Sequence, residues 1–271
     1  MTSGPARIAW ATTSGSSGKT TSTVTTAAIL AERGHRVLVV DGDWQMDASR
    51  WLGLDETELP DDRRTLLDVL LDRDTVTEAI APSSVPGIDL LPSSPSLQEA
   101  ARILARTRGV EGQLRRALDT VEDAYYTILI DCRAGTEIPT VAGIVAATSI
   151  IGTTQAGLKE LRNTVSLMDY VPSIADGYER PLTLVGILPC AVPAAGRAYR
   201  EALDLAQEVF GADVLLPPVR RSVAVTEAHA ERVPLTARAR WAPVTDDYRA
   251  VVAELVSRGV IAADATVGSG A

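Results

Sequence analysis

The chain has 271 residues, 46% of them hydrophobic, which is enough apolar material to bury the core of an α/β domain. Its formal net charge of −9 excludes a broad basic field, so any contact with nucleic acid has to come from a local patch. The two cysteines, Cys132 and Cys190, are too few for a disulfide framework or a zinc site. Without a signal-peptide pattern or an apolar run of membrane-spanning length, we expect a soluble, cytoplasmic protein.

Short apolar runs typical of buried parallel strands alternate along the chain with segments of helical periodicity. Strands are predicted over residues 8–11, 36–41, 88–92, 126–131, 149–154, 182–188 and 214–216. A first helix carries Val24 and Ala31, and further helices are predicted over residues 65–71, 75–81, 96–107, 110–120, 138–147, 158–171, 195–210, 222–229 and 244–258. Residues 55–64 are expected to form a surface loop, and residues 262–271 to fray. This alternation predicts a single domain over 1–271, a doubly wound, mostly parallel sheet with helices on both faces.

Residues 12–21, TTSGSSGKTT, lie between the first predicted strand and the first helix. A strand, a small-residue loop and a helix N-terminus in this order form a phosphate cradle, because the two glycines let backbone N–H groups point inward. Lys19, one of only two lysines, would reach the β- and γ-phosphates, and the Thr20 hydroxyl would bind Mg²⁺. The pattern G-x-x-x-x-G-K-[ST] departs at Thr13, so the alternative is a turn whose serines and threonines cap a helix.

Three aspartates lie at the carboxyl ends of predicted strands, where ligands bind in sheets of this kind. Asp131 can hold Mg²⁺ opposite Thr20, directly or through water. Of Asp41 and Asp43, one can orient an attacking water and the other can brace the water shell of the metal. The alternative for each carboxylate is that it caps a turn or a helix.

Together these motifs resemble the ParA/MinD family of deviant Walker ATPases, whose chains carry K-G-G-x-G-K-T-T, D-x-D-P-Q-x-N-A-S and W-L-G. Their counterparts here are SGSSGKTT at 14–21, DGDWQMDAS at 41–49 and WLG at 51–53. The family motifs Y-D-x-I-I-I-D-C and I-P-R-x-V-x-x-x-E-A have similar sequences at residues 126–132 and 219–228. The resemblance covers nearly the whole chain and is greatest to the short plasmid- or chromosome-partition ParA proteins.

The resemblance implies an ATPase that uses ATP/ADP and Mg²⁺, forms a homodimer with ATP, binds duplex DNA non-specifically and is reset by slow, partner-stimulated hydrolysis. The partner would be ParB-like or a cargo adaptor, and the protein would be nucleoid-associated. Lys19, Asp43 and Asp131 would be catalytic, with Asp131 as the Walker B residue and Asp43 supporting hydrolysis. The metal would be held by Thr20, Asp43 and Asp131, and the nucleotide by Gly15, Ser16, Ser17, Gly18, Lys19, Thr20 and Thr21.

This sequence departs from the family pattern at three positions. Ser14 stands where the family has a signature lysine that reaches the phosphates of the dimer partner, and Trp44 and Arg220 stand where it has proline. Lys159 is the only other lysine and is a candidate for the cation that acts on the partner's site. The alternative for Lys159 is a solvated helix residue paired with a neighbouring acid.

Four arginines are candidates for the DNA contacts that the family makes through its C-terminal helices: Arg197, Arg200, Arg220 and Arg221. The alternative is that they pair with neighbouring acids on a solvated face. The chain ends in a segment that is neither basic nor strongly amphipathic, unlike the membrane helix of MinD proteins, so we expect no membrane binding. Two other functions stay open: an ATPase that positions a protein cluster or an organelle, and a nucleotide-responsive binding module with little turnover.

Overall fold

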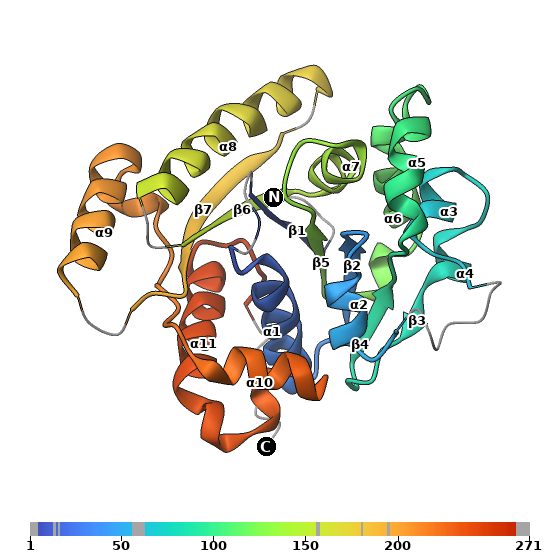
Figure 1. The fold of residues 1–271 in the computed structure, drawn as a ribbon. Coiled ribbons are helices and arrows are strands. Elements are labelled where there is room, and N and C mark those ends of the chain that lie inside the picture. The colour runs from blue at the N-terminus through green and yellow to red at the C-terminus, as the bar shows by residue number, and fades with distance from the viewer. Residues whose placement is uncertain are drawn as a thin grey trace, which may run out of the picture.

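A seven-stranded sheet lies at the centre of the computed structural model, which describes residues 5–12, 15, 17–55, 63–155, 158–179, 181–193 and 196–263 (Figure 1). The strand order is β3-β4-β2-β5-β1-β6-β7, and each pair is parallel except the pair β3 and β4. The strands are β1 Ala6–Ala11, β2 Val37–Gly42, β3 Ala81–Pro82, β4 Ile88–Leu91, β5 Thr127–Cys132, β6 Ser149–Gln155 and β7 Thr183–Cys190. The predicted doubly wound, mostly parallel α/β sheet is therefore confirmed.

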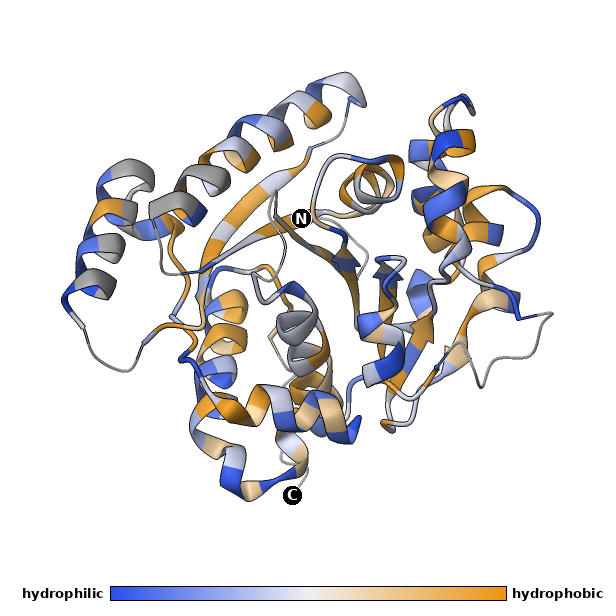
Figure 2. Ribbon diagram, viewed as in Figure 1, coloured by the Kyte–Doolittle hydropathy of each residue, from blue (hydrophilic) through white to orange (hydrophobic). Residues whose placement is uncertain are grey.

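Helices cover both faces of this sheet because successive strand residues point to opposite sides. In β2, Leu38 and Val40 pack into one core with α3, α5, α6, α7 and α8, whereas Val37 and Val39 pack into another with α1, α2, α10 and α11. Figure 2 shows the resulting pattern: the strands are largely hydrophobic, and many helices carry both hydrophobic and hydrophilic residues. The helices are α1 Lys19–Glu32, α2 Asp47–Trp51, α3 Leu66–Leu70, α4 Val76–Ala79, α5 Ser96–Leu104, α6 Gln113–Asp119, α7 Ile138–Ala146, α8 Leu158–Gly177, α9 Arg197–Phe210, α10 Val223–Glu231 and α11 Ala242–Ser257.

Prolines explain where the structure departs from the predicted elements. The strand predicted over 214–216 is wrong: a 3-10 helix covers Ala212–Val214, and Leu215 makes only an isolated bridge to Ile187, because prolines at 217 and 218 supply no N–H for a longer ladder. The helix predicted over 75–81 ends at Ala79, since a proline disfavours helical backbone at the residue before it, and Ala81–Pro82 forms the edge strand β3.

Helix α8 shows the opposite outcome, because it runs six residues beyond the predicted end at 171 and contains Pro172. Val171 and Ile174 are buried on either side of this proline, so core packing favours the continued helix. Most of the predicted surface loop, at 56–62, and of the predicted fraying tail, at 264–271, lies outside the described residues. Within the described part of the chain, no helix combines the length and the apolarity that crossing a bilayer requires.

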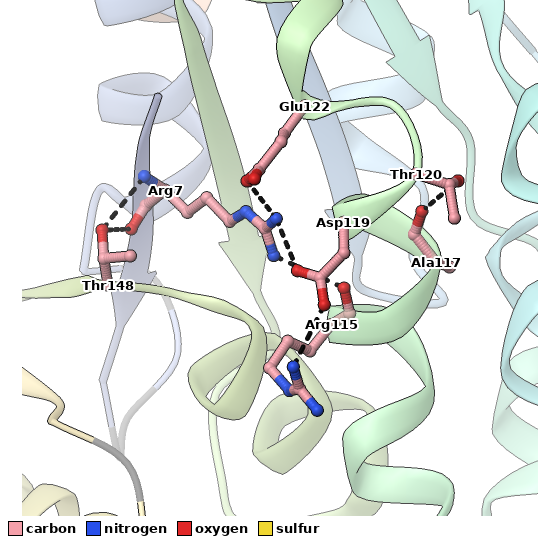
Figure 3. Close-up of polar contacts among 7 residues, drawn as sticks. All are labelled: Arg7, Arg115, Ala117, Asp119, Thr120, Glu122 and Thr148. Atoms are coloured by element: carbon pink, nitrogen blue, oxygen red, sulfur yellow. Dashed lines mark hydrogen bonds and ion pairs between the residues drawn. The ribbon is translucent and has the colours of Figure 1, made fainter. Parts of the chain in front are cut away.

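A buried arginine fixes the amino end of β1, away from the ligand edge of the sheet (Figure 3). Arg7 is 4% exposed, and its guanidinium donates to Asp119 Oδ1 at 2.7 Å and also contacts Glu122. Thr148, just before β6, exchanges hydrogen bonds of 3.1 and 3.2 Å with the backbone of Arg7. These contacts tie β1 to α6 and to the start of β6, so the strand that leads into residues 12–21 has a fixed position.

Candidate functional site

The glycine-rich segment joins the carboxyl end of β1 to α1, where backbone geometry requires glycine. Gly18 has φ +93°, in the left-handed region, and directly precedes α1. A Cβ on Gly18 would lie 2.8 Å from Cys190 Sγ on β7, so this position also has no room for a side chain. The Ser22 hydroxyl donates to the Gly18 carbonyl at 2.7 Å, and the hydroxyls of Ser17 and Thr153 are 2.8 Å apart. These contacts anchor the end of the loop and the first turn of α1 against β6 and β7.

Two neighbouring strands bring acidic side chains to the same edge. Asp41 on β2 is the register partner of Asp131 on β5, and these strands approach closely at Gly42, where a Cβ would lie 2.9 Å from the Asp131 carbonyl. The Thr20 hydroxyl donates to Asp131 Oδ2 at 2.7 Å. Lys19, which begins α1, is only 7% exposed and carries the positive charge facing this carboxylate. Thr20, Lys19 and Asp131 therefore lie together, as the sequence predicted.

Asp41 has a different environment, because two backbone N–H groups and a hydroxyl already donate hydrogen bonds to its carboxylate oxygens. Its Oδ2 accepts hydrogen bonds from the Ser49 N–H at 2.8 Å and the Ser49 hydroxyl at 2.6 Å, and its Oδ1 accepts from the Asp43 N–H at 3.1 Å. Burial raises the pKa of Asp41 to about 7, and the bonds from Ser49 oppose that rise. Asp41 fits the turn-capping alternative: it shapes the segment that presents Asp43 to the pocket.

Asp131 is the buried carboxylate with unused capacity for a ligand. Burial raises the pKa of Asp131 to about 8, the negative charge of Asp41 adds to the rise, and Lys19 opposes it. Its Oδ1 is buried and has no hydrogen-bond partner among the described residues. A hydroxyl and a carboxylate oxygen side by side match the hard oxygen donors that Mg²⁺ prefers. No cluster of three or more His, Cys, Asp or Glu side chains suited to a metal occurs in the described ranges, so the remaining ligands would come from phosphate and water.

A pocket of about 540 Å³ opens beside these residues, within the range of small-molecule sites. One wall is the glycine-rich segment and the first turn of α1, with Gly15, Ser17, Gly18, Lys19, Thr20 and Thr21. The other comes from the chain after β7 and from α10 and α11, including Arg220, Arg221, His229 and Tyr248. Asp43 and Arg133 also line the pocket. Ser14 and Ser16 lie outside the described residues, as does the side chain of Lys159 at the start of α8.

Comparisons with known proteins agree with this geometry. A family model described as "AAA domain" matches residues 6–183, more than half of the chain. An uncharacterised protein of Mycobacterium tuberculosis is 34% identical over 260 residues, which cover 94% of this chain and 80% of that protein. Chromosome partitioning protein ParA of Caulobacter vibrioides is 27% identical over 261 residues, covering 95% and 97%. The chain belongs to the ParA/MinD family of P-loop ATPases.

Solved structures share the fold of this ParA/MinD-family chain. Apo McdA of Cyanothece aligns with a TM-score of 0.85 at 20% identity, over 93% of this chain and 99% of that protein. Cobyrinic acid a,c-diamide synthase from Mycobacterium smegmatis, with bound ADP and magnesium, aligns with a TM-score of 0.75 at 28% identity, over 84% and 91%. The likeness extends over most of the sheet and its helices.

Arg133 is a pocket residue that the sequence analysis missed. Its guanidinium carbon lies 3.6 Å from the centroid of the Trp44 ring, and its Nε lies 3.7 Å from Asp43 Oδ1. A signal was present, since Arg133 follows the strand-end residue Asp131 by two positions and so emerges at the same sheet edge. No local pattern marks Tyr248, whose hydroxyl lies 3.3 Å from Ser22 Oγ, because tertiary packing alone brings α11 to this wall.

The four arginines considered for DNA separate into two places. Arg220 and Arg221 line the pocket, and Arg220 donates to both carboxylate oxygens of Asp247 at 2.6 and 2.7 Å. Arg197 and Arg200 are exposed on α9, beyond the β7 edge of the sheet (Figure 1). Arg197 pairs with the acidic residue one helical turn along, at 2.6 Å. The paired-arginine alternative therefore describes Arg220 and Arg197.

Proposed function

We propose that this ParA/MinD-family chain acts as one domain that binds ATP or ADP with Mg²⁺ in the pocket and hydrolyses ATP slowly. One observation carries the proposal: Oδ1 of buried Asp131 has no hydrogen-bond partner among the described residues, although its Oδ2 accepts from the Thr20 hydroxyl. This carboxylate lies beside the glycine cradle and buried Lys19. A high-pKa carboxylate with a free oxygen is costly to keep charged unless a cation binds there. The M. smegmatis relative with bound ADP and magnesium supports the same ligand here.

Each residue of the cradle has a role in this proposal. Backbone N–H groups of the glycine-rich segment, Gly15 to Gly18, and the free donors of the first turn of α1, Thr21 included, would hold the phosphate oxygens. Lys19 would contact the β- and γ-phosphates. Thr20 and Asp131 would hold the magnesium ion, which when bound offsets phosphate charge. Asp43, shaped by its turn, would contact the water shell of the metal and orient the attacking water.

Hydrolysis would follow in-line attack on the terminal phosphate. The oxygen of the water that Asp43 orients forms a bond to the γ-phosphorus, and the bond from that phosphorus to the bridging oxygen of ADP breaks. The water proton ends on inorganic phosphate, and ADP leaves with the electron pair of the broken bond. Lys19 and the inward N–H groups stabilise the charge that builds on the phosphate oxygens.

ATP binding would also drive homodimerisation, with hydrolysis resetting the monomer. We propose that the dimer retains non-specific duplex DNA at the nucleoid, and that a ParB-like or cargo-adaptor protein accelerates hydrolysis. The Caulobacter relative named as a chromosome partitioning protein supports a partition role. The same cycle would serve an ATPase that positions a protein cluster. Ser14, in place of the family's signature lysine, favours a third possibility, a nucleotide-responsive module with little turnover.

Phosphate release from Mg-ATP tests the enzyme proposal. We expect slow release by the parent protein, faster release with duplex DNA plus the partner, and no release without Mg²⁺. Tight ATP binding with no release under any of these conditions would leave the binding module as the function. Failure to bind ATP or ADP would refute the nucleotide proposal as a whole.

DNA retention is tested on α9, since Arg220 and Arg221 line the pocket and their loss would also disturb nucleotide binding. Arg197→Ala with Arg200→Ala is expected to abolish ATP-dependent retention on duplex DNA at moderate salt, because it removes two charges per protomer from the dimer. ATP hydrolysis without DNA should be unchanged. Arg102→Ala with Arg106→Ala, which removes two exposed arginines at α5 and just after it, is the matched control. Retention equal to that of the parent would refute the α9 assignment.

For the dimer, we propose that Lys159 contributes the cation that acts on the partner's phosphates. Lys159→Ala should then lose ATP-dependent dimerisation, as measured by light scattering after gel filtration, while it still binds ATP. A variant that dimerises with ATP as well as the parent would show that another group supplies this charge.

A further inference from the structure

Arg133 is held at the pocket edge between an aromatic ring and two carboxylates. The Trp44 ring packs against its guanidinium at 3.6 Å, within the distance of a cation–π contact. Its Nε lies 3.7 Å from Asp43 Oδ1 and its Nη1 lies 3.4 Å from Glu137 Oε1. The side chain is 28% exposed, so water and a ligand in the pocket can both reach it.

These contacts hold the guanidinium in place but leave it undersatisfied. A guanidinium has five N–H donors, and charge-assisted bonds to carboxylates are normally about 2.7–2.9 Å long. Here the one contact of that length is Nη1 to the neighbouring carbonyl of Ala134, at 2.9 Å. Asp43 Oδ1 meanwhile accepts from the Gln45 N–H at 3.1 Å. Arg133 therefore retains donors for an anion entering the pocket.

A second arginine of the same pocket shows the contrast. Arg220 donates to both oxygens of Asp247 at 2.6 and 2.7 Å, a bidentate pair that already uses the face of its guanidinium. Arg133 also differs in position, because it comes two residues after Asp131 and faces Asp43. It thus lies on the acidic, metal-binding side of the pocket, where the terminal phosphate of a bound triphosphate would be.

We propose that Arg133 is a catalytic residue that contacts the terminal phosphate of ATP, and that Trp44 is its positioning residue; this inference rests on the proposed nucleotide site. In the resting protein Arg133 lies beside Asp43. With ATP bound, its free donors bind γ-phosphate oxygens and stabilise the charge that shifts as the bond to ADP breaks. Asp43, released from the arginine, orients the attacking water. ADP has no γ-phosphate, so it leaves Arg133 beside Asp43.

The test compares ATP with ADP by calorimetry in the presence of Mg²⁺. Arg133→Ala should weaken ATP binding about 10- to 100-fold, the loss expected for a hydrogen bond to a charged group, and leave ADP binding unchanged. Arg133→Lys, which keeps the charge without the planar fork, should lie between the two. Arg102→Ala controls for the loss of one positive charge. The turnover number of Arg133→Ala should fall more than its affinity for ATP.

Trp44 gives a readout that does not depend on turnover. ATP, but not ADP, should change the tryptophan emission of the parent protein, because the guanidinium turns from Asp43 toward the phosphate while it stays packed on the Trp44 ring. That change should be absent from Trp44→Phe and from Arg133→Ala. Trp44→Phe retains an aromatic face and should keep nearly full ATP affinity, whereas Trp44→Leu should lose part of it.

The possible outcomes separate this inference from the function beneath it. A parent protein that binds neither nucleotide refutes the proposed function. A parent that binds both, with Arg133→Ala showing the same preference for ATP over ADP, refutes only the role of Arg133. Faster hydrolysis by Arg133→Ala would also overturn it, because the arginine would then restrain Asp43. If Arg133→Ala does not fold, the test uses Arg133→Lys instead. An Arg133→Lys protein with the ATP affinity and turnover number of the parent would then refute the inference.

Discussion

Replacing Asp131 by asparagine should stabilise the ligand-free protein while it abolishes magnesium-dependent nucleotide binding. Burial raises the pKa of Asp131 to about 8, from the 3.8 that is usual for an aspartate in water. Between about pH 4 and pH 8 the folded state consequently binds more protons at this group than the unfolded state does, so the free energy of unfolding falls as the pH rises. An asparagine at this position does not titrate and removes that contribution.

The two opposing terms determine the sign of the effect. At pH 7 the shift of the Asp131 pKa costs about 4 kcal/mol, from roughly three pH units at 1.36 kcal/mol each. In Asp131→Asn the amide N–H₂ takes the buried place of Oδ1, which has no hydrogen-bond partner among the described residues, and leaving these donors unpaired costs about 1–3 kcal/mol. The net gain is about 2 kcal/mol, which raises the unfolding temperature of a domain of this size by about 3 to 4 °C.

Thermal unfolding from pH 5 to pH 8, without nucleotide, measures this gain, and Asp41→Asn is the control. Asp41 accepts three hydrogen bonds from Ser49 and Asp43, so its amide leaves donors unpaired and should not stabilise the fold. Calorimetry with Mg-ATP on the same samples measures binding. The reasoning is refuted if Asp131→Asn unfolds at a lower temperature than the parent at pH 7 and retains the parental pH slope.

Three further predictions follow from the same structure. Gly18→Ala should lose nucleotide binding and lower the free energy of unfolding in urea by about 1–2 kcal/mol or more. The reason is that it combines a left-handed φ with a Cβ 2.8 Å from Cys190 Sγ. Nucleotide binding equal to that of the parent would show that the loop tolerates a side chain. Arg7→Met should lower the free energy of unfolding by about 1–3 kcal/mol with no change in nucleotide affinity, since its ion pairs lie at the opposite end of β1 (Figure 3); an altered affinity would mean that this end of the strand communicates with the pocket. Affinity for Mg-ATP should rise with pH, by up to about tenfold per unit, until Asp131 is ionised near pH 8; a flat profile in calorimetry would contradict a role for this carboxylate in holding the metal.

Strand-end chemistry could be predicted from the sequence because it depends on local patterns. Apolar runs placed β1, β2 and β5, and parallel pairing then required the residues after them to share one edge. The same logic placed Asp131 beside Thr20. It could not separate Asp41 from Asp43, because only the folded loop shows that Ser49 occupies the first carboxylate.

Features that depend on contacts between distant segments could not be predicted in this way. The stacking of Arg133 on Trp44 joins the ends of two strands that are neighbours only once the sheet has formed. Tyr248 reaches the pocket because α11 packs against α1. In the sequence, Pro172 predicts the end of a helix. In the structure α8 continues through it, because Val171 and Ile174 on either side are buried in the core.

The central claim is that a glycine cradle and the buried ammonium group of Lys19 hold a magnesium nucleotide. Calorimetric titration of the folded parent protein and of Lys19→Ala with ATP, with and without Mg²⁺, tests it most directly. Binding by the parent that requires Mg²⁺, and its loss in a Lys19→Ala protein with parental unfolding behaviour, is the predicted result. Equal affinities for the parent and the variant, or no binding to either, would contradict the claim.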